Sequence, residues 1–163
     1  MQYDTAVASP QWVMLVYRLP RTPSTPRIAL WRKLRRLGVA QIVDGVVALP
    51  ADGDNREQLE WLAEDVVQAG GDATIWLAQP ATAAQHRTLA RAMTEAVEAE
   101  YREIGAEARA ARQTPPAERR RTLARLRREL RRVGARQHFP TEEAGRAREA
   151  VEALARAAAE AAA

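Results

Sequence analysis

Arginine is concentrated in one stretch near the C-terminal end of the chain. Between Arg119 and Arg136 the sequence carries nine arginines and one acidic residue, Glu129. Four of the arginines recur at i, i+4, i+7 and i+11, the spacing of a single helix face, and they are Arg121, Arg125, Arg128 and Arg132. A row of guanidinium groups on one face can follow the phosphate backbone of a nucleic acid. These four residues are therefore candidate DNA-binding residues.

Two other interpretations of this arginine row stay open at the level of sequence. The row can be a solvated helix face that is neutralised by acidic residues of the same chain, such as Glu98, Glu100 and Glu107. It can also dock against the acidic segment 52–65 of another subunit, in which six acidic residues accompany one arginine.

A second basic cluster lies nearer the N-terminus. Five cations fall within one predicted helix, and they are Arg27, Arg32, Lys33, Arg35 and Arg36. Arg18 lies at the end of the strand that precedes this helix. Guanidinium groups bind oxyanions in a bidentate geometry, so the candidate oxyanion-binding residues are Arg18, Arg27, Arg32 and Arg35. The alternative is a set of ordinary exposed charges on an amphipathic helix.

The residue types that usually perform catalysis or hold metals are scarce. The chain has no cysteine and two histidines, His86 and His138. It shows no glycine-rich phosphate loop and no Ser-His-Asp spacing. We therefore assign no catalytic residue, no metal ligand and no cofactor, and we expect a protein that is not an enzyme.

The first half of the chain must position the second basic cluster. The apolar period changes from about 2 to about 3.6 and back, twice over, between Trp12 and Leu77. This predicts a strand over 12–18, a helix before Gly38, strands over 39–43 and 46–50, a helix to Ala69 and a last strand around 73–77. Asp44-Gly45 predicts a tight turn between the two short strands. The βαββαβ order is that of a ferredoxin-like α+β fold.

The second half shows no strand pattern. Its apolar spacing predicts a long helix over 82–112, a second helix over 117–134 and a third that opens at Pro140-Thr141. We expect a ferredoxin-like domain over 1–79 and an all-helical extension of three helices over 80–163, a helical hairpin plus a C-terminal helix, packed on that domain.

The four tryptophans fall on predicted helices and strands. Trp31 aligns with Leu30, Leu34 and Leu37, so we expect it to face the sheet. We expect all four tryptophans to serve packing rather than base stacking, although Trp12 and Trp76 could lie on an exposed sheet face.

Ordered segments of the first half resemble a known family. The segments are WVMLVYRLP, RIALWRKLRRLGV, DGVVALP, WLAEDV and GGDATIWL, followed downstream by RRVGARQHFP. They resemble the N-terminal domain of the ChrB family of chromate-resistance regulatory proteins, and the likeness spans roughly Trp12 to Leu154. The resemblance implies a bacterial, chromate-responsive regulator of transcription that binds DNA, or an oxyanion such as chromate, through its Arg-rich helices.

Two features limit what this resemblance implies. Many ChrB proteins carry an additional C-terminal domain, which we do not expect within these residues. The ferredoxin-like pattern is also similar to the middle domain of PaaX-type repressors, but only eleven residues precede the first strand, so we expect no winged helix before it.

Two alternatives to the regulator remain. One is a metal-dependent nuclease related to the CRISPR adaptation endoribonucleases, whose first strand ends in a metal-binding Asp. This chain has Tyr17 and Arg18 at that place, which disfavours cleavage. The other alternative is a structural module that binds another protein through its helices.

The composition indicates where the protein works and with what. The formal net charge is +4, and the concentration of arginine favours an anionic partner. No signal peptide and no membrane span are apparent, so we expect a cytoplasmic protein without a membrane partner. A homodimer is also expected, with the ferredoxin-like domain as its interface.

Overall fold

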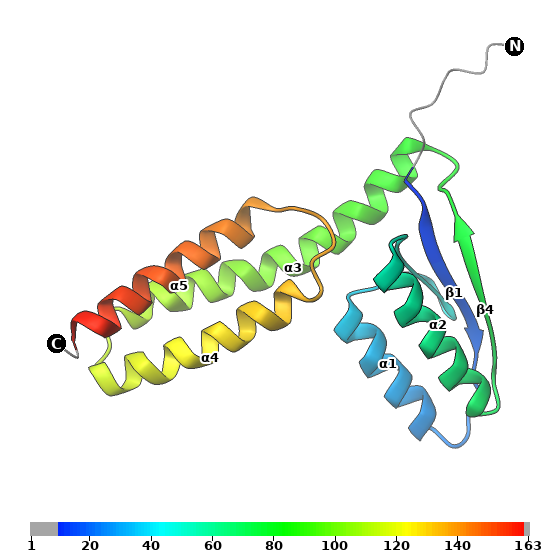
Figure 1. Cartoon of the computed structure of the whole chain (residues 1–163), viewed down its shortest axis with the longest axis horizontal. Coiled ribbons are helices and arrows are strands. Elements are labelled where there is room, and N and C mark those ends of the chain that lie inside the picture. Colours follow the sequence, from blue (N-terminus) through cyan, green and yellow to red (C-terminus); the bar gives the residue numbers. More distant parts are fainter. Residues whose placement is uncertain (1–9, 162–163) are drawn as a thin grey trace, which may run out of the picture. The chain divides into compact units, whose positions relative to one another are not determined.

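The computed structural model describes residues 10–161 and has the α+β architecture that the sequence predicts (Figure 1). Contacts between residues divide the chain into two compact units, one ending at Arg91 and the other starting at Ala92. The elements of the first half are β1 (Trp12–Arg18), α1 (Thr25–Leu37), β2 (Ala40–Val43), β3 (Val46–Pro50), α2 (Gly53–Gln68) and β4 (Asp72–Ala78). They are followed by α3 (Ala83–Ala111), α4 (Pro116–Gly134) and α5 (Glu142–Glu160).

The first unit is built on an antiparallel sheet with the strand order β2-β3-β1-β4. Strand β1 is apolar on both faces and lies inside the sheet, as expected for a central strand. Val13 pairs with Leu49 and Leu15 with Val47, and all four side chains are fully buried. Directly opposite residues share a face, so these two pairs form the core between the sheet and the helices.

Helices α1 and α2 lie side by side along the sheet (Figure 1). Helix α1 buries Leu30 and Leu34, and α2 buries Leu59, Leu62 and Val66. Lys33 of α1 donates to the Asp65 carboxylate of α2 at 2.5 Å. This is the ferredoxin-like arrangement that the βαββαβ order predicts.

The turn between β2 and β3 requires glycine. Gly45 has a φ of 78°, in the left-handed region that residues with a Cβ seldom adopt. A Cβ at this position would lie 2.5 Å from the Tyr17 carbonyl oxygen. The Tyr17 amide donates to the Gly45 carbonyl at 2.8 Å, so the turn is held directly against the end of β1.

Three of the four tryptophans are exposed, and one of them is Trp31, which was predicted to face the sheet. Trp12 is buried, but Trp31, Trp61 and Trp76 are 55%, 52% and 58% exposed. Successive helical residues are rotated by about 100° around the axis. Trp31 therefore points well to the side of neighbouring Leu30, which faces the sheet, and the prediction that Trp31 also faces the sheet was wrong.

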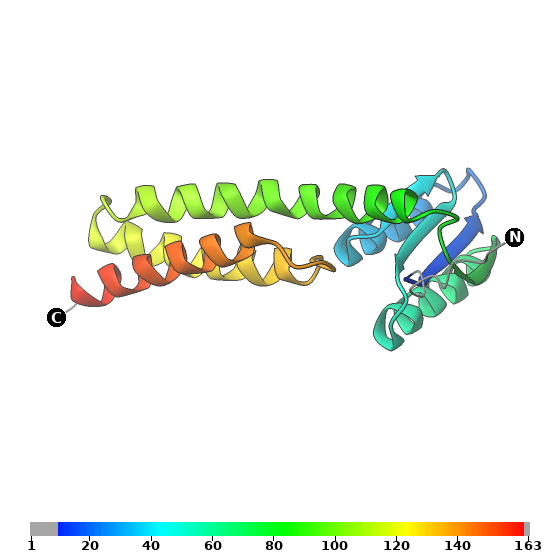
Figure 2. The same ribbon diagram turned by 90° about the horizontal axis from the view of Figure 1, so that it is seen from above.

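The second unit consists of α4, α5 and the C-terminal part of α3, side by side (Figures 1 and 2). Helices α3 and α4 agree with the predicted ranges to within one residue at each end, and α5 begins within two residues of its predicted start. Their core contains Tyr101, Leu126, Val151 and Leu154, each at most 1% exposed. Several buried alanines complete it, and small side chains of this kind let helices approach closely.

Candidate functional site

A hollow of about 840 Å³ lies between α1, the end of β1 and the β2–β3 turn. Arg18, Arg27 and Arg32 all line it, so the fold brings together three of the four arginines predicted to bind an oxyanion. We call this hollow the arginine hollow. Arg35 does not line it; its guanidinium carbon lies 4.9 Å from the ring centroid of Trp31, in a cation–π contact.

Two of the three arginines have no carboxylate partner in the described part of the chain. Arg18 pairs with Asp72 of β4 at 3.2 Å, but both side chains are more than 80% exposed. Such a pair contributes little because water screens it. For Arg27 and Arg32 no carboxylate of residues 10–161 lies within 4.0 Å. The guanidinium groups of the hollow are therefore available to an anion.

A phenol and a carboxylate, those of Tyr17 and Asp44, also line the arginine hollow. Burial raises the pKa of the Tyr17 phenol above its ordinary value of 10.0; nearby Asp44 raises it further, and Arg27 opposes them. The phenol therefore stays neutral at physiological pH and can donate a hydrogen bond. Asp44 also lines the hollow, and its carboxylate repels any anion that approaches that side.

Sequence reasoning missed the apolar and amide components of this site. Trp31 and Ile28 form an apolar wall, and Gln41 of β2 lies on the opposite element. The signal for Trp31 was present, because Leu30, Leu34 and Leu37 complete the buried stripe of α1 without it. No local signal marked Gln41, since only the register of β2 brings it toward α1.

The predicted DNA-binding row on α4 is interrupted at its second member. Arg121, Arg128 and Arg132 are exposed and form no ion pair among residues 10–161. Arg125 instead donates to Glu107 of α3 and, at 2.8 Å, to Glu129 of its own helix. These hydrogen bonds, first to Glu107 and then to Glu129, raise its pKa. Arg125 thus differs from the other three members of the row, because Glu107 of a neighbouring helix and Glu129 neutralise it. The DNA-binding role of the row remains a prediction.

Arg136 at the end of the arginine-rich stretch is also neutralised within the unit. Its two terminal nitrogens donate to the two carboxylate oxygens of Glu100, each at 2.6 Å. These bonds are the main cause of its raised pKa. Internal neutralisation by Glu100 and Glu107 therefore applies to Arg136 and Arg125, and not to the three exposed arginines.

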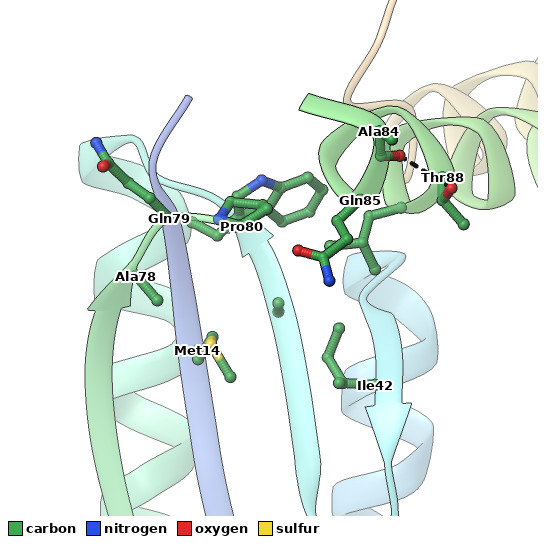
Figure 3. A pocket seen from close by; sticks show the side chains of 11 residues that line it. Met14, Ile42, Ala78, Gln79, Pro80, Ala84, Gln85 and Thr88 are labelled. Carbon is green, nitrogen blue, oxygen red and sulfur yellow. Dashed lines mark hydrogen bonds between the residues drawn. The ribbon is translucent and has the colours of Figure 1, made fainter. Parts of the chain in front are cut away.

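A second hollow, of about 470 Å³, lies on the other face of the sheet (Figure 3). Met14, Ile42 and Ala48 from the strands face Ala84 and Leu89 of α3 across it. None of the described residues that line it is charged. Beside it, the Trp12 indole donates to Nδ1 of His86 at 3.1 Å. This hollow is apolar and is not a site for an oxyanion.

Two further properties bear on the site. Within residues 10–161, no three His, Cys, Asp or Glu side chains are grouped so that they could hold a metal ion. None of the described helices combines the length and apolarity that crossing a membrane requires.

Comparison with known proteins gives the family. The family of the N-terminal region of protein ChrB matches residues 27–114, more than half of the chain. The chain belongs to the ChrB N-terminal family. The match includes α1, with Arg27, Arg32 and Arg35. It ends before α4, so it does not cover the exposed arginine row.

A curated relative supports this membership. Protein ChrB of Cupriavidus metallidurans (strain ATCC 43123 / DSM 2839 / NBRC 102507 / CH34) is 36% identical over 66 residues, which are 40% of this chain and 20% of that protein. The matched segment thus spans a fifth of the relative's length. The family match and this relative together confirm the resemblance to ChrB.

Proposed function

We propose that this protein is a chromate-responsive regulatory protein of the ChrB type, which binds an oxyanion in the arginine hollow and DNA through α4. One observation carries the proposal. Arg18 of β1 and Arg27 and Arg32 of α1 line one hollow, and two of them have no carboxylate within 4.0 Å among residues 10–161. Clustered guanidinium groups of this kind favour a dianion such as chromate over a monovalent ion.

The DNA-binding part of the proposal rests on α4. Arg121, Arg128 and Arg132 share one exposed face at spacings of seven and four residues, and the excess of positive charge on this helix suits a phosphate backbone. Arg125 supports the row by tying α4 to α3 through Glu107 and is not itself expected to contact phosphate. Regulation would follow if an oxyanion in the first unit altered DNA affinity, which binding of a labelled duplex with and without chromate tests.

The oxyanion site is tested by titration. Chromate and, separately, sulfate are added while Trp fluorescence is recorded, with a Trp31→Phe variant showing how much of the signal comes from the hollow. Chromate absorbs light, so sulfate and calorimetric titration guard against an optical artefact. We expect saturable binding that the double variant R27Q/R32Q weakens at least tenfold, because two cationic hydrogen-bonding partners are lost.

The matched control removes the same charge elsewhere in the first unit. Arg21 and Arg36 are exposed and do not line the hollow, so R21Q/R36Q should bind almost as well as the wild type. Equal weakening by the two double variants would mean that only net charge matters and would refute a defined site.

A further inference from the structure

We infer that the arginine hollow accepts a nucleotide, with its phosphate on the arginines and its planar base against Trp31. This inference rests on the proposed oxyanion site and extends it, since it names the molecule that carries the oxyanion. In this view an inorganic oxyanion such as chromate occupies only the phosphate position and competes with the nucleotide.

The size of the hollow is the first argument. At about 840 Å³ it falls among pockets that enclose whole organic ligands, roughly 300–1,000 Å³. A tetrahedral oxyanion, with one central atom and four oxygens, fills only the part next to the guanidinium groups. The remaining volume lies beside Trp31 and Ile28, where an isolated anion gains nothing.

The exposed tryptophan is the second argument. Trp31 lines the hollow and is 55% exposed, so the apolar surface of its ring is accessible to a planar ligand there, and covering that surface is favourable. Arg35 lies over the ring and restrains its orientation. No second aromatic ring of residues 10–161 stacks on Trp31. Aromatic side chains beside cationic ones are the usual means of binding nucleotide units.

Two hydrogen-bond acceptors that line the hollow, on Gln41 and Asp44, are the third argument. The Gln41 amide donates to the Val43 carbonyl at 2.6 Å, which directs its own carbonyl oxygen as an acceptor. Asp44 adds a second acceptor. Acceptors repel an oxyanion but suit the hydroxyl groups of a sugar or the amino group of a base. The hollow thus offers acceptors beside its guanidinium groups, which suits a ligand that carries neutral hydroxyl or amino groups in addition to its anionic group.

Calorimetric titration of the full chain with four probes tests the inference. The probes are adenosine monophosphate, adenosine, ribose phosphate and inorganic phosphate. We expect adenosine monophosphate to bind about tenfold or more tightly than ribose phosphate, the size of one base–aromatic stacking contact. Chromate should compete with it.

Three variants assign the contributions. W31A should reduce the affinity for adenosine monophosphate to that for ribose phosphate and leave phosphate binding unchanged, whereas W31F should retain most of the preference. W61A is the control, because Trp61 is similarly exposed on α2 and does not line the hollow. R27Q/R32Q should weaken all the phosphate-bearing probes together.

The outcomes separate the inference from the proposed function. If sulfate and chromate bind in the hollow but adenosine monophosphate binds no more tightly than ribose phosphate, the inference is overturned and the oxyanion site stands. If no oxyanion binds, both fail. If W31A and W61A have equal effects, the assignment to Trp31 is overturned. A short single-stranded oligonucleotide shows whether the bound nucleotide is free or part of a strand. If the oligonucleotide binds more tightly than adenosine monophosphate, the ligand is an unpaired strand; if the two bind equally, it is the free nucleotide.

Discussion

Tyr101 shows how one side chain can organise the second unit. It is 1% exposed, and its hydroxyl donates to the Gln137 side-chain oxygen at 2.7 Å. Gln137 lies after the end of α4, and its own amide donates to the Phe139 carbonyl at 3.1 Å. The phenol therefore links α3 to the segment between α4 and α5.

Alkaline pH should weaken this unit through Tyr101. Burial raises the pKa of Tyr101 above 10.0, a shift that nearby Arg148 and Arg136 oppose. The folded state thus favours the neutral phenol, so its stabilisation is complete below the pKa of the unfolded chain and is lost as pH rises through the folded pKa. We expect the free energy of unfolding to fall as pH rises above the unfolded pKa of 10.0, and to fall less steeply in Y101F.

Urea unfolding followed by circular dichroism at several pH values measures this effect. At neutral pH Y101F should be less stable by about 1 kcal/mol, because the Gln137 oxygen loses its donor. An identical pH dependence in Y101F and wild type would show that Tyr101 is not the group responsible.

Helix α4 presents arginine on more than one side, and the proposed DNA binding depends on which of these sides contacts phosphate. One exposed row contains Arg121, Arg128 and Arg132, and the adjacent side carries Arg120, Arg127 and Arg131, also exposed. The buried side, with Leu123, Leu126 and Val133, holds the helix in its unit. The two sets differ in position but not in charge.

Binding to duplex DNA at several salt concentrations should distinguish these two rows. Removing phosphate contacts reduces the salt dependence by about 0.9 per contact, so R121A/R128A/R132A should flatten the slope of log K against log salt by roughly 3. Fluorescence anisotropy of a labelled duplex gives the slope. R120A/R127A/R131A is the charge-matched control and should change it much less; equal changes would argue for a diffuse cationic surface.

At the scale of the whole molecule, the chain consists of two units whose unfolding can be followed by different spectroscopic signals. All four tryptophans occur between Trp12 and Trp76, within the first unit. Helices α4 and α5 belong to the second unit and contribute to the far-ultraviolet circular dichroism. Helices α1 and α2 of the first unit contribute to it as well. A circular dichroism transition that tryptophan fluorescence does not show therefore reports the second unit. The domain boundary at residue 79, the packing of the extension on the first domain, the homodimer and the cytoplasmic location remain predictions.

Gly45→Ala should destabilise the first unit selectively. The alanine Cβ would lie 2.5 Å from the Tyr17 carbonyl, and the backbone would hold a φ of 78°. A cost of about 1–3 kcal/mol is expected for strain of this kind. The tryptophan fluorescence transition in urea should move to lower concentration, while the circular dichroism keeps a later transition from the second unit.

Gly53→Ala provides the control. Gly53 begins α2, and a Cβ there has nothing within 4 Å, so this change should leave both transitions in place or stabilise slightly. If G45A moves the fluorescence and circular dichroism transitions by the same amount, the chain unfolds as one cooperative body and the two-domain proposal is wrong.

Local patterns in the sequence were sufficient to predict the elements and the fold class. The period of apolar residues records which side of each strand or helix is buried, and this information is contained in a few consecutive residues. Asp44-Gly45 predicted the β2–β3 turn for the same reason. A tight turn needs a left-handed backbone at one residue, and the glycine that permits it is visible in the sequence itself. The resemblance to ChrB likewise depended on ordered local segments.

The tertiary structure decided which of these residues meet. Arg18 and Arg32 line one hollow because β1 ends beside α1, and Gln41 lies there because of the register of β2. Arg125 pairs with Glu107, eighteen residues earlier in the chain and on another helix. Contacts between distant segments depend on the packing of whole elements, so spacing along the chain predicted the arginine clusters but not which of their charges stay free.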